Sequence, residues 1–98
     1  MAVNTPLTPG SVVSRTEGLM STSLGEELVI LNPANDDYVG LDEIGRRVWD
    51  LLVRPEPVQD LCLRLTREYR GDPRQISADI LDFLNEMAAE GLVYVADR

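Results

Sequence analysis

The sequence predicts a small α+β domain in which an antiparallel sheet of about three strands precedes three helices. The first half has short apolar runs separated by turn residues, whereas the second half repeats apolar residues at helical spacing between clear cap signals. The two patterns meet within residues 36–52, where a short extended run passes directly into a helix. A chain of 98 residues has room for one hydrophobic core. We therefore predict a flexible tail over residues 1–10 and one domain over residues 11–98.

The sheet is predicted from three extended runs. Residues 11–17 form the first candidate strand, and residues 26–32 contain an uninterrupted apolar stretch before a turn that starts at Pro33. Residues 38–41 are the partner strand across that turn. Residues 19–25 are rich in serine and threonine and fit either a frayed strand or a loop. The last strand should leave an exposed edge beside the first helix, where another extended chain can pair.

The first two helices are predicted from their ends and from one apolar face each. Asp42 is the expected N-cap of the first helix, whose apolar positions are Ile44, Val48, Trp49, Leu51 and Leu52. A proline-rich break follows, and Pro57 is the expected first residue of the second helix. The apolar positions of that helix are Val58, Leu61, Cys62, Leu65 and Tyr69, and Gly71 should end it.

The third helix has the clearest signals in the chain. Asp72 and Gln75 fit a capping box, in which each side chain bonds the backbone N–H of the other residue. The helix should end at Glu90, where Gly91 supplies a left-handed cap and Leu92 folds back onto the last turn. Its apolar arc is unusually wide and contains Ile76, Ile80, Leu81, Phe83, Leu84, Met87 and Ala88, with Asp79, Asp82, Glu86 and Glu90 along one edge. Part of so wide an arc can stay free once the core is built.

The charge balance and the missing residue types exclude several function classes. The net charge is −8, with nine arginines, no lysine and no histidine, so a nucleic-acid partner is not expected. Cys62 lies on an apolar helix face and has no histidine to activate it, and the pairs Asp36/Asp37 and Asp79/Asp82 fit turns and solvated faces better than a metal site. We therefore expect no catalysis, no cofactor and no metal. The sequence also lacks a signal-like or membrane-spanning run, which predicts a cytoplasmic protein without a membrane partner.

Two interpretations follow from the residues alone. In the first, the open strand edge and the third helix form a site for β-strand addition, where a partner's backbone pairs with the edge and its side chains enter pockets along the helix. In the second, Tyr38 and Val39 only pack the sheet, and the acidic flank of the helix only keeps the domain soluble. A winged-helix DNA-binding regulator has a similar order of elements, but its acidic third helix would face phosphate.

Several motifs occur in a fixed order over residues 11–95. They are LNP at residues 31–33, DYVGLDEIGRRVWDLL at 37–52, LCLRLTREY at 61–69 and DPRQISADILDFLNEMAAEGLV at 72–93. In this order, with the patterns YxGLxxxGxxxW and FLxxxxxxGLV, the sequence resembles the PqqD family, the leader-peptide recognition domains of ribosomally synthesised and post-translationally modified peptide pathways. Many members have Asn-Glu-Thr where this chain has Asp42-Glu43-Ile44, but Gly45 and Trp49 are kept. With Trp49, the chain looks most like the stand-alone proteins of lasso-peptide pathways.

The resemblance implies a winged-helix-like fold in which a leader segment docks as an extra strand on the third strand and lies against the third helix. By this resemblance, the backbone edge is formed by Asp37, Tyr38, Val39, Gly40 and Leu41. The apolar pocket walls are Ile76, Ile80, Phe83 and Met87, and the acids that could meet cationic leader residues are Asp79, Asp82 and Glu86. Ile80 and Leu41 could instead belong to the core, and Tyr38 could lie on the other face of the sheet.

The resemblance also implies partners. A non-catalytic protein of this kind binds the leader of a precursor peptide and works with a leader-cleaving cysteine protease and an ATP-dependent cyclase in lasso-peptide biosynthesis. The alternative is a PqqD-type peptide chaperone for a radical-SAM enzyme in the synthesis of pyrroloquinoline quinone or another modified peptide. These motifs specify neither the peptide nor the oligomeric state.

Overall fold

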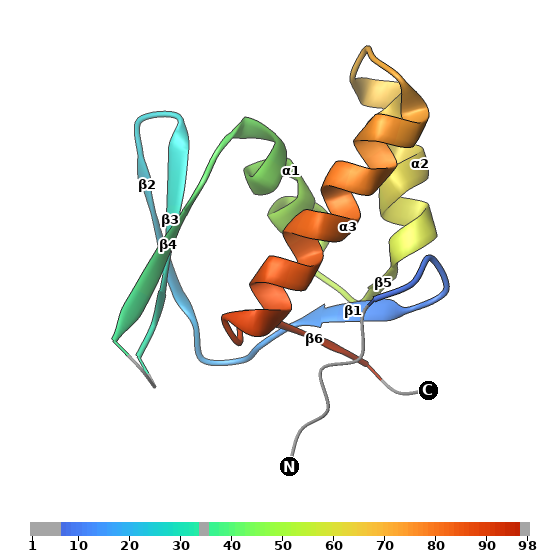
Figure 1. Cartoon of the computed structure of the whole chain (residues 1–98). Helices are drawn as coiled ribbons and strands as arrows, with labels where there is room; N and C mark the ends of the chain where they lie inside the picture. The colour runs from blue at the N-terminus through green and yellow to red at the C-terminus, as the bar shows by residue number, and fades with distance from the viewer. Residues whose placement is uncertain (1–6, 34–35, 97–98) are drawn as a thin grey trace.

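Two small antiparallel sheets are joined by a layer of three helices (Figure 1). The computed structural model describes residues 7–33 and 36–96. One sheet has the strand order β2-β3-β4 and consists of β2 (Met20–Leu24), β3 (Glu27–Asn32) and β4 (Asp37–Leu41). The other has the order β5-β1-β6 and consists of β5 (Glu56–Pro57), β1 (Val12–Arg15) and β6 (Val93–Val95). The helices are α1 (Glu43–Leu51), α2 (Val58–Glu68) and α3 (Pro73–Ala89).

The predicted fold class, a winged-helix-like α+β domain with a three-stranded antiparallel sheet and three helices, is confirmed. The meander is built from β2, β3 and β4, so most of residues 19–25 belongs to a strand and not to a loop. The first predicted strand lies outside this meander, because β1 pairs with β5 and with the C-terminal β6. The second sheet was not predicted. Its partners are far apart in the sequence, and β5 has only two residues, Glu56 and Pro57.

The β2–β3–β4 sheet buries one of its faces. Leu28 and Ile30 of β3 are buried and lie opposite Leu41 and Val39 of β4. Side chains alternate between the two faces of a strand, so Val29 of β3 lies on the opposite, outer face with its β4 partner Gly40. β3 pairs with one side of β4, and none of the described strands pairs with the other. β4 is therefore an edge strand beside the helices.

α1 begins as predicted. The Asp42 side chain accepts a hydrogen bond of 2.9 Å from the backbone N–H of Gly45, which satisfies one of the free donors of the first turn. Val48 and Trp49 are buried, and Leu52 is buried just after the helix. The prediction was wrong for Ile44, which is 43% exposed, because it lies at the margin of the face that Val48 and Trp49 turn toward the core.

α3 differs from its prediction at its start and agrees with it at its end. The Asp72 side chain accepts from the N–H of Arg74, not of Gln75, and the Gln75 amide donates forward to Asp79 over 2.8 Å. The reciprocal capping box is therefore not formed. At the other end, Gly91 has φ of +79°, and the N–H of Leu92 bonds the carbonyl of Met87 over 2.9 Å. This is the predicted Schellman motif.

α2 begins one residue later than predicted, because Pro57 is the N-cap and belongs to β5. The helix is tied to α1 by an ion pair in which Arg47 donates two bonds of 2.8 Å to the Glu68 carboxylate. This bidentate bond raises the pKa of Arg47 and lowers the pKa of Glu68. Gly71, with φ of +143°, lies in the turn to α3.

Residues ahead of β1 also pack against the helices. Leu7 is buried, and its N–H bonds the side-chain oxygen of Asn85 on α3 over 3.1 Å. The carbonyl of Pro9 accepts from the N–H of Gln59 on α2. Packing therefore extends four residues ahead of the predicted domain start at residue 11, while residues 1–6 of the predicted tail lie outside the described residues.

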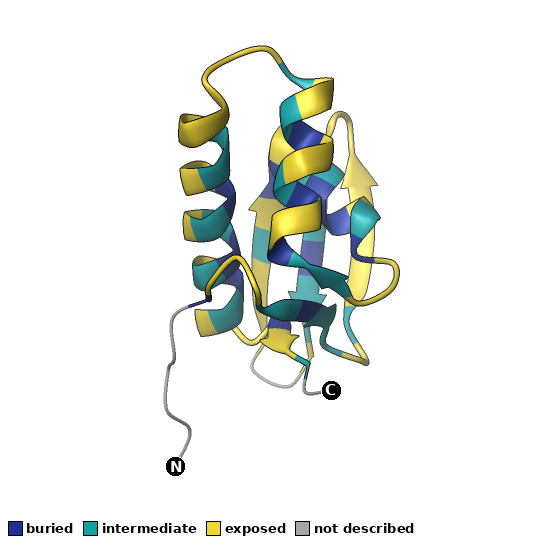
Figure 2. Cartoon of the chain, turned by 90° about the vertical axis from the view of Figure 1, so that its right-hand side faces the viewer, coloured by how far each residue is buried: buried dark blue, intermediate teal, exposed yellow. Residues whose placement is uncertain are grey.

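The core lies between the helices and the two sheets, as Figure 2 shows by the buried inner faces of the helices. Its largest fully buried side chains include Ile30, Leu61, Leu65, Ile80 and Leu84. At its margin, the Arg15 guanidinium stacks over the Trp49 ring at 4.5 Å and donates to the Trp49 carbonyl. Burial lowers the pKa of Arg15, and nearby Asp50 opposes that shift.

Candidate functional site

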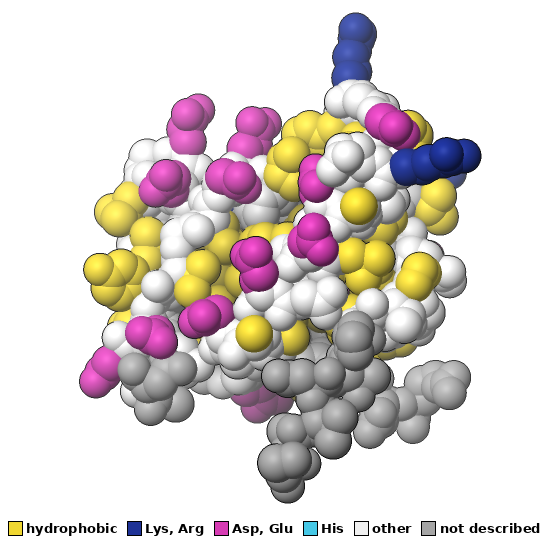
Figure 3. Space-filling model, viewed as in Figure 1, with side chains coloured by type: hydrophobic (Ala, Val, Ile, Leu, Met, Phe, Trp, Pro, Cys, Tyr) yellow, Lys and Arg dark blue, Asp and Glu magenta, His cyan; other side chains and the backbone are white. Residues whose placement is uncertain are grey.

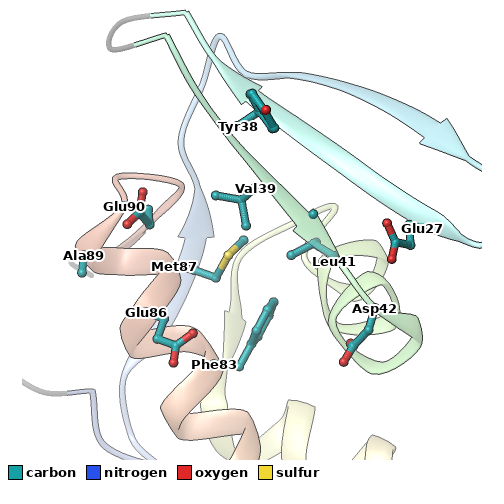
Figure 4. A pocket seen from close by; sticks show the side chains of 11 residues that line it. Glu27, Tyr38, Val39, Leu41, Asp42, Phe83, Glu86, Met87, Ala89 and Glu90 are labelled. Carbon is teal, nitrogen blue, oxygen red and sulfur yellow. The ribbon is translucent and has the colours of Figure 1, made fainter.

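An open groove of about 650 Å³ lies between β4 and α3 (Figure 4). Its walls come from β4, from the last turns of α3, and from the ends of β3 and α1. The lining residues are Glu27, Tyr38, Val39, Gly40, Leu41, Asp42, Phe83, Glu86, Met87, Ala89 and Glu90.

The floor of the groove is apolar. Val39 and Leu41 are two residues apart on β4, so both point toward α3. Phe83 and Met87 are four residues apart on α3, so both point toward β4. Leu41 and Met87 are each 2% exposed and also belong to the core, whereas Val39 and Phe83 are half-buried and open to the groove.

Phe83 is positioned by a glycine of α1. A methyl group on Gly45 would lie 3.1 Å from Cε1 of the Phe83 ring and 3.3 Å from the capping oxygen of Asp42. The absence of a side chain at Gly45 therefore lets the ring lie against α1 while Asp42 keeps its cap. This contact joins the glycine of the YxGLxxxGxxxW motif to the phenylalanine of the FLxxxxxxGLV motif.

One side of the groove is a free strand edge. β4 pairs with β3 through residues 37–41, and its other edge faces the groove without a described strand beside it. An edge strand presents backbone N–H and C=O groups that can pair with an added chain. The groove therefore combines a row of backbone hydrogen-bonding groups with an apolar floor.

The rims of the groove are acidic. Glu86 and Glu90 are exposed on α3, and Glu27 and Asp42 are exposed on the strand side. Figure 3 shows acidic side chains over the β2–β3–β4 sheet and α3, with Arg side chains at the end where α2 and α3 meet. Opposite charges attract over about 10 Å at moderate salt. The groove therefore favours a guest with cationic residues next to apolar ones.

The structure brings together seven of the twelve predicted site residues. Tyr38, Val39, Gly40, Leu41, Phe83, Glu86 and Met87 line the groove. The exposed Tyr38 ring and Gly40 lie on the outer face of the sheet, as the pairing of β4 with β3 requires. Leu41 lies in both the groove and the core.

The other five predicted residues do not line the groove. Ile80 is 1% exposed in the core, and Ile76 packs at the edge of the core near Gly71. Asp79 bonds Gln75, Asp82 is exposed on α3, and Asp37 is at the far start of β4. The predicted arc includes residues in the first two turns of α3, whereas the groove is lined by α3 residues from Phe83 onward.

Sequence reasoning missed Glu27, Asp42, Ala89 and Glu90 as lining residues. Glu90 is on the acidic edge of the predicted arc. Because residues four apart on a helix share a face, its spacing from Glu86 could have added it to the predicted site. Glu27 lies on another strand, and no local pattern marks it, because its place depends on the register between β3 and β4.

A second hollow of about 420 Å³ lies on the other side of α3, between α3 and α2. Its walls are mainly apolar and include Val58, Cys62 and Leu63 of α2 and Leu81 of α3. Cys62 is a free, half-buried thiol in this wall. Within the described part of the chain, no group of three or more His, Cys, Asp or Glu residues could hold a metal ion. Among the same residues, no helix has the length and apolarity needed to cross a membrane.

The family model for coenzyme PQQ synthesis protein D (PqqD) matches residues 27–93 of this chain. That range contains β3, β4, all three helices and every residue that lines the groove. None of the curated protein sequences matches this chain.

Solved structures with the same fold include two complexes with peptides. TbiB1 in complex with the TbiA(beta) leader peptide shares 28% sequence identity, with 86% of this chain and 99% of that chain covered and a TM-score of 0.76. Lasso peptide synthetase B1 complexed with the leader peptide shares 16% identity, with 84% and 96% covered and a TM-score of 0.74.

A third similar structure has no partner in its description. It is the PqqD truncation of Methylobacterium extorquens PqqCD, a stand-alone recognition element for ribosomally synthesised and post-translationally modified peptides. It shares 24% identity, with 93% of this chain and 97% of that chain covered and a TM-score of 0.77. At their low identities, this structure and lasso peptide synthetase B1 show the fold alone.

Proposed function

The chain belongs to the PqqD family, and from that premise we propose that it binds the leader segment of a ribosomally synthesised precursor peptide in the β4–α3 groove. The leader pairs with the free edge of β4 and becomes the next strand of the β2–β3–β4 sheet. The single observation that carries this proposal is the edge of β4 that pairs with none of the described strands and lies directly beside the apolar floor of the groove. Backbone pairing supplies affinity for any extended chain, and the floor adds selectivity.

The floor selects a guest with alternating side chains. In an added strand, every second side chain points the same way as Val39 and Leu41 and reaches Phe83 and Met87. Burying apolar guest residues at these positions stabilises the complex by roughly 25 cal/mol for each Å² of apolar surface removed from water. The acidic rims then favour cationic residues at flanking positions. An extended leader segment with apolar residues at alternate positions and cationic residues beside them satisfies both requirements.

The protein acts as a binding module that presents the leader to other enzymes. The likeness to TbiB1, whose structure holds the TbiA(beta) leader peptide, supports the leader-binding step of this proposal. We assign the protein to lasso-peptide biosynthesis, where a leader-cleaving cysteine protease and a cyclase act on the presented precursor. The fold of lasso peptide synthetase B1 is compatible with this placement.

Peptide titration followed by NMR tests the binding step. The probes are the TbiA(beta) leader peptide and synthetic leaders from short reading frames encoded near this gene. Saturable shifts should concentrate on the amides of β4 and on residues 83–90, which form the last turns and the C-cap of α3. The absence of saturable binding by every probe, or shifts confined to the α2–α3 hollow, would reject the site.

Delivery is tested separately. Cleavage of the bound precursor by a leader-cleaving cysteine protease should be faster with the protein present than without it. A Val39→Asp variant that folds but does not bind should give no acceleration. Equal rates with the wild-type protein and with this variant would show that binding is not used for delivery.

A second candidate is the one in the family's own description. Coenzyme PQQ synthesis protein D gives the family its name. The role that we propose as this second candidate is that of a peptide chaperone for a radical-SAM enzyme, with the peptide bound in the same groove. Titration of the peptide-bound protein with each enzyme distinguishes the two roles, since this role requires a radical-SAM enzyme as binding partner in place of a leader protease.

A further inference from the structure

The outer face of β4 has a gap where the strand carries no side chain. Gly40 lies between the exposed Tyr38 ring and Asp42 along the strand, and it is directly opposite Val29 of β3. The next outward residue of β3 toward its start is Glu27. The Glu27 carboxylate leans over the gap, because a methyl group on Gly40 would lie 4.0 Å from its Oε1. Both residues line the groove.

Glu27 is open to a partner from the side of the groove. It is exposed, and within residues 7–33 and 36–96 it forms no ion pair with an arginine. Side chains larger than hydrogen at position 40 would stand between the carboxylate and the free edge of β4. With glycine there, a long side chain arriving over the edge can lie across the strand and reach Glu27.

We infer that Glu27, Gly40 and Tyr38 form a subsite for one arginine or lysine side chain of the bound strand. This inference rests on the proposed strand addition to β4. The guest residue paired with Gly40 must point to the outer face, because directly opposed residues of neighbouring strands share a face. Its Cβ lies about 5 Å from the position opposite, and its methylene stem covers the Gly40 backbone beside the Tyr38 ring. Its cationic end then meets the Glu27 carboxylate.

The subsite fixes the register of the guest. The neighbours of this guest residue on either side point inward to the floor formed by Val39, Leu41, Phe83 and Met87. The preferred guest therefore has the order apolar, cationic, apolar. A shift by one residue would place the cation over the floor and an apolar side chain at Glu27, so the acid disfavours that register.

Selection from a phage-displayed library of random dodecapeptides tests this without knowledge of the natural leader. Peptides selected on the wild-type protein should contain an apolar-Arg/Lys-apolar core. On Glu27→Gln, the cationic preference at the central position should disappear while both apolar preferences remain. The matched control is Glu26→Gln, which removes the same charge one residue away in the β2–β3 turn and should select the wild-type core.

Titration with one selected dodecapeptide measures the interaction. Glu27→Gln should weaken binding about two- to fivefold at low salt, as expected for a partly exposed ion pair. Replacing the central cation of the peptide by glutamine should cost the same factor with the wild-type protein and nothing further with Glu27→Gln. Gly40→Val should also weaken the cationic peptide more than its glutamine version, because the added side chain covers the carboxylate.

The outcomes separate this inference from the proposed function. If no peptide is selected on the wild-type protein, or if Val39→Asp selects the same peptides, strand addition in the groove is wrong. If the apolar positions are selected but the central cation is absent, or survives in Glu27→Gln, the subsite is wrong and strand addition stands.

Discussion

The two hollows beside α3 both have apolar side chains in their walls, but they differ in what borders them, and the walls of the β4–α3 groove also carry four acidic residues. The β4–α3 groove is bordered by a strand whose outer edge pairs with no strand in the described part of the chain, and the α2–α3 hollow is bordered by two helices. Backbone groups within a helix are bonded internally, so the α2–α3 hollow can offer an extended chain mainly side-chain contacts. The edge of β4 offers a row of backbone donors and acceptors as well. An apolar hollow therefore becomes a site for an extended peptide when a free strand edge borders it.

The comparison is tested most strongly by placing one charge in each hollow. Val39→Asp puts a carboxylate on the floor of the β4–α3 groove and should weaken leader binding roughly a hundredfold or more, because the charge loses its water when the strand docks. Leu63→Asp makes the same change in the α2–α3 hollow, where Leu63 is 55% exposed, and should leave binding unchanged. Titration calorimetry measures both. Equal losses in the two variants would mean that the hollows are not distinct in function.

A second pair of variants compares the acidic residues of α3. Glu86→Gln with Glu90→Gln removes two rim charges and should weaken binding of a cationic leader about three- to tenfold. Asp79→Asn with Asp82→Asn removes two charges from the same helix outside the groove and should change binding less than twofold at 0.15 M salt. Matching losses would show that long-range charge, and not the groove rim, attracts the leader.

Gly45→Ala sharpens the comparison by changing the shape of one hollow. The added methyl group would lie 3.1 Å from the Phe83 ring, which can give way toward the groove because it is half-buried there. We expect about fivefold weaker leader binding from this displacement. The free energy of unfolding should stay within about 1 kcal/mol of the wild-type value. Alanine is more favourable than glycine within a helix, and this gain offsets the cost of the close contact between the methyl group and the ring. Unchanged affinity would mean that the ring does not move or that it does not touch the leader.

The smallest expected effect lies away from both hollows. Glu68→Gln removes the ion pair with Arg47 and should lower the free energy of unfolding by at most about 1 kcal/mol, without changing leader binding. The pKa of Glu68 is lowered in the folded state, so the contribution is present above the ordinary glutamate pKa. It is lost as the pH falls through the lower folded-state pKa. Urea unfolding of both proteins should therefore differ at pH 7 and converge in acid, whereas a Glu17→Gln control should show no such difference at pH 7.

Local signals predicted most of the fold. The Asp42 cap, the Gly91 cap and the edge position of β4 each follow from a few neighbouring residues. The second sheet could not be predicted in the same way, because β1 pairs with strands more than 40 residues away in the sequence. The two residues of β5 carry no pattern of their own.

The parts of the candidate site that could be predicted are those in which one strand or helix alone determines where a side chain points. Alternation along β4 is enough to place Val39 and Leu41 on one face. The helix arc could not show which end of α3 borders the groove, because Ile80 and Phe83 have the same apolar character and only packing against α1 and α2 separates them. The place of Glu27 in the groove depends on the register between β3 and β4, so the sequence did not predict it as a lining residue.

The stack of Arg15 on Trp49 has a practical consequence for all these experiments. Trp49 is the one tryptophan in the sequence, is 5% exposed, and lines neither hollow. Its emission should therefore change when the molecule denatures and stay nearly constant when a tryptophan-free ligand docks. Each substitution can thus be checked for native structure in the same cuvette, with no label, before its loss of affinity is interpreted.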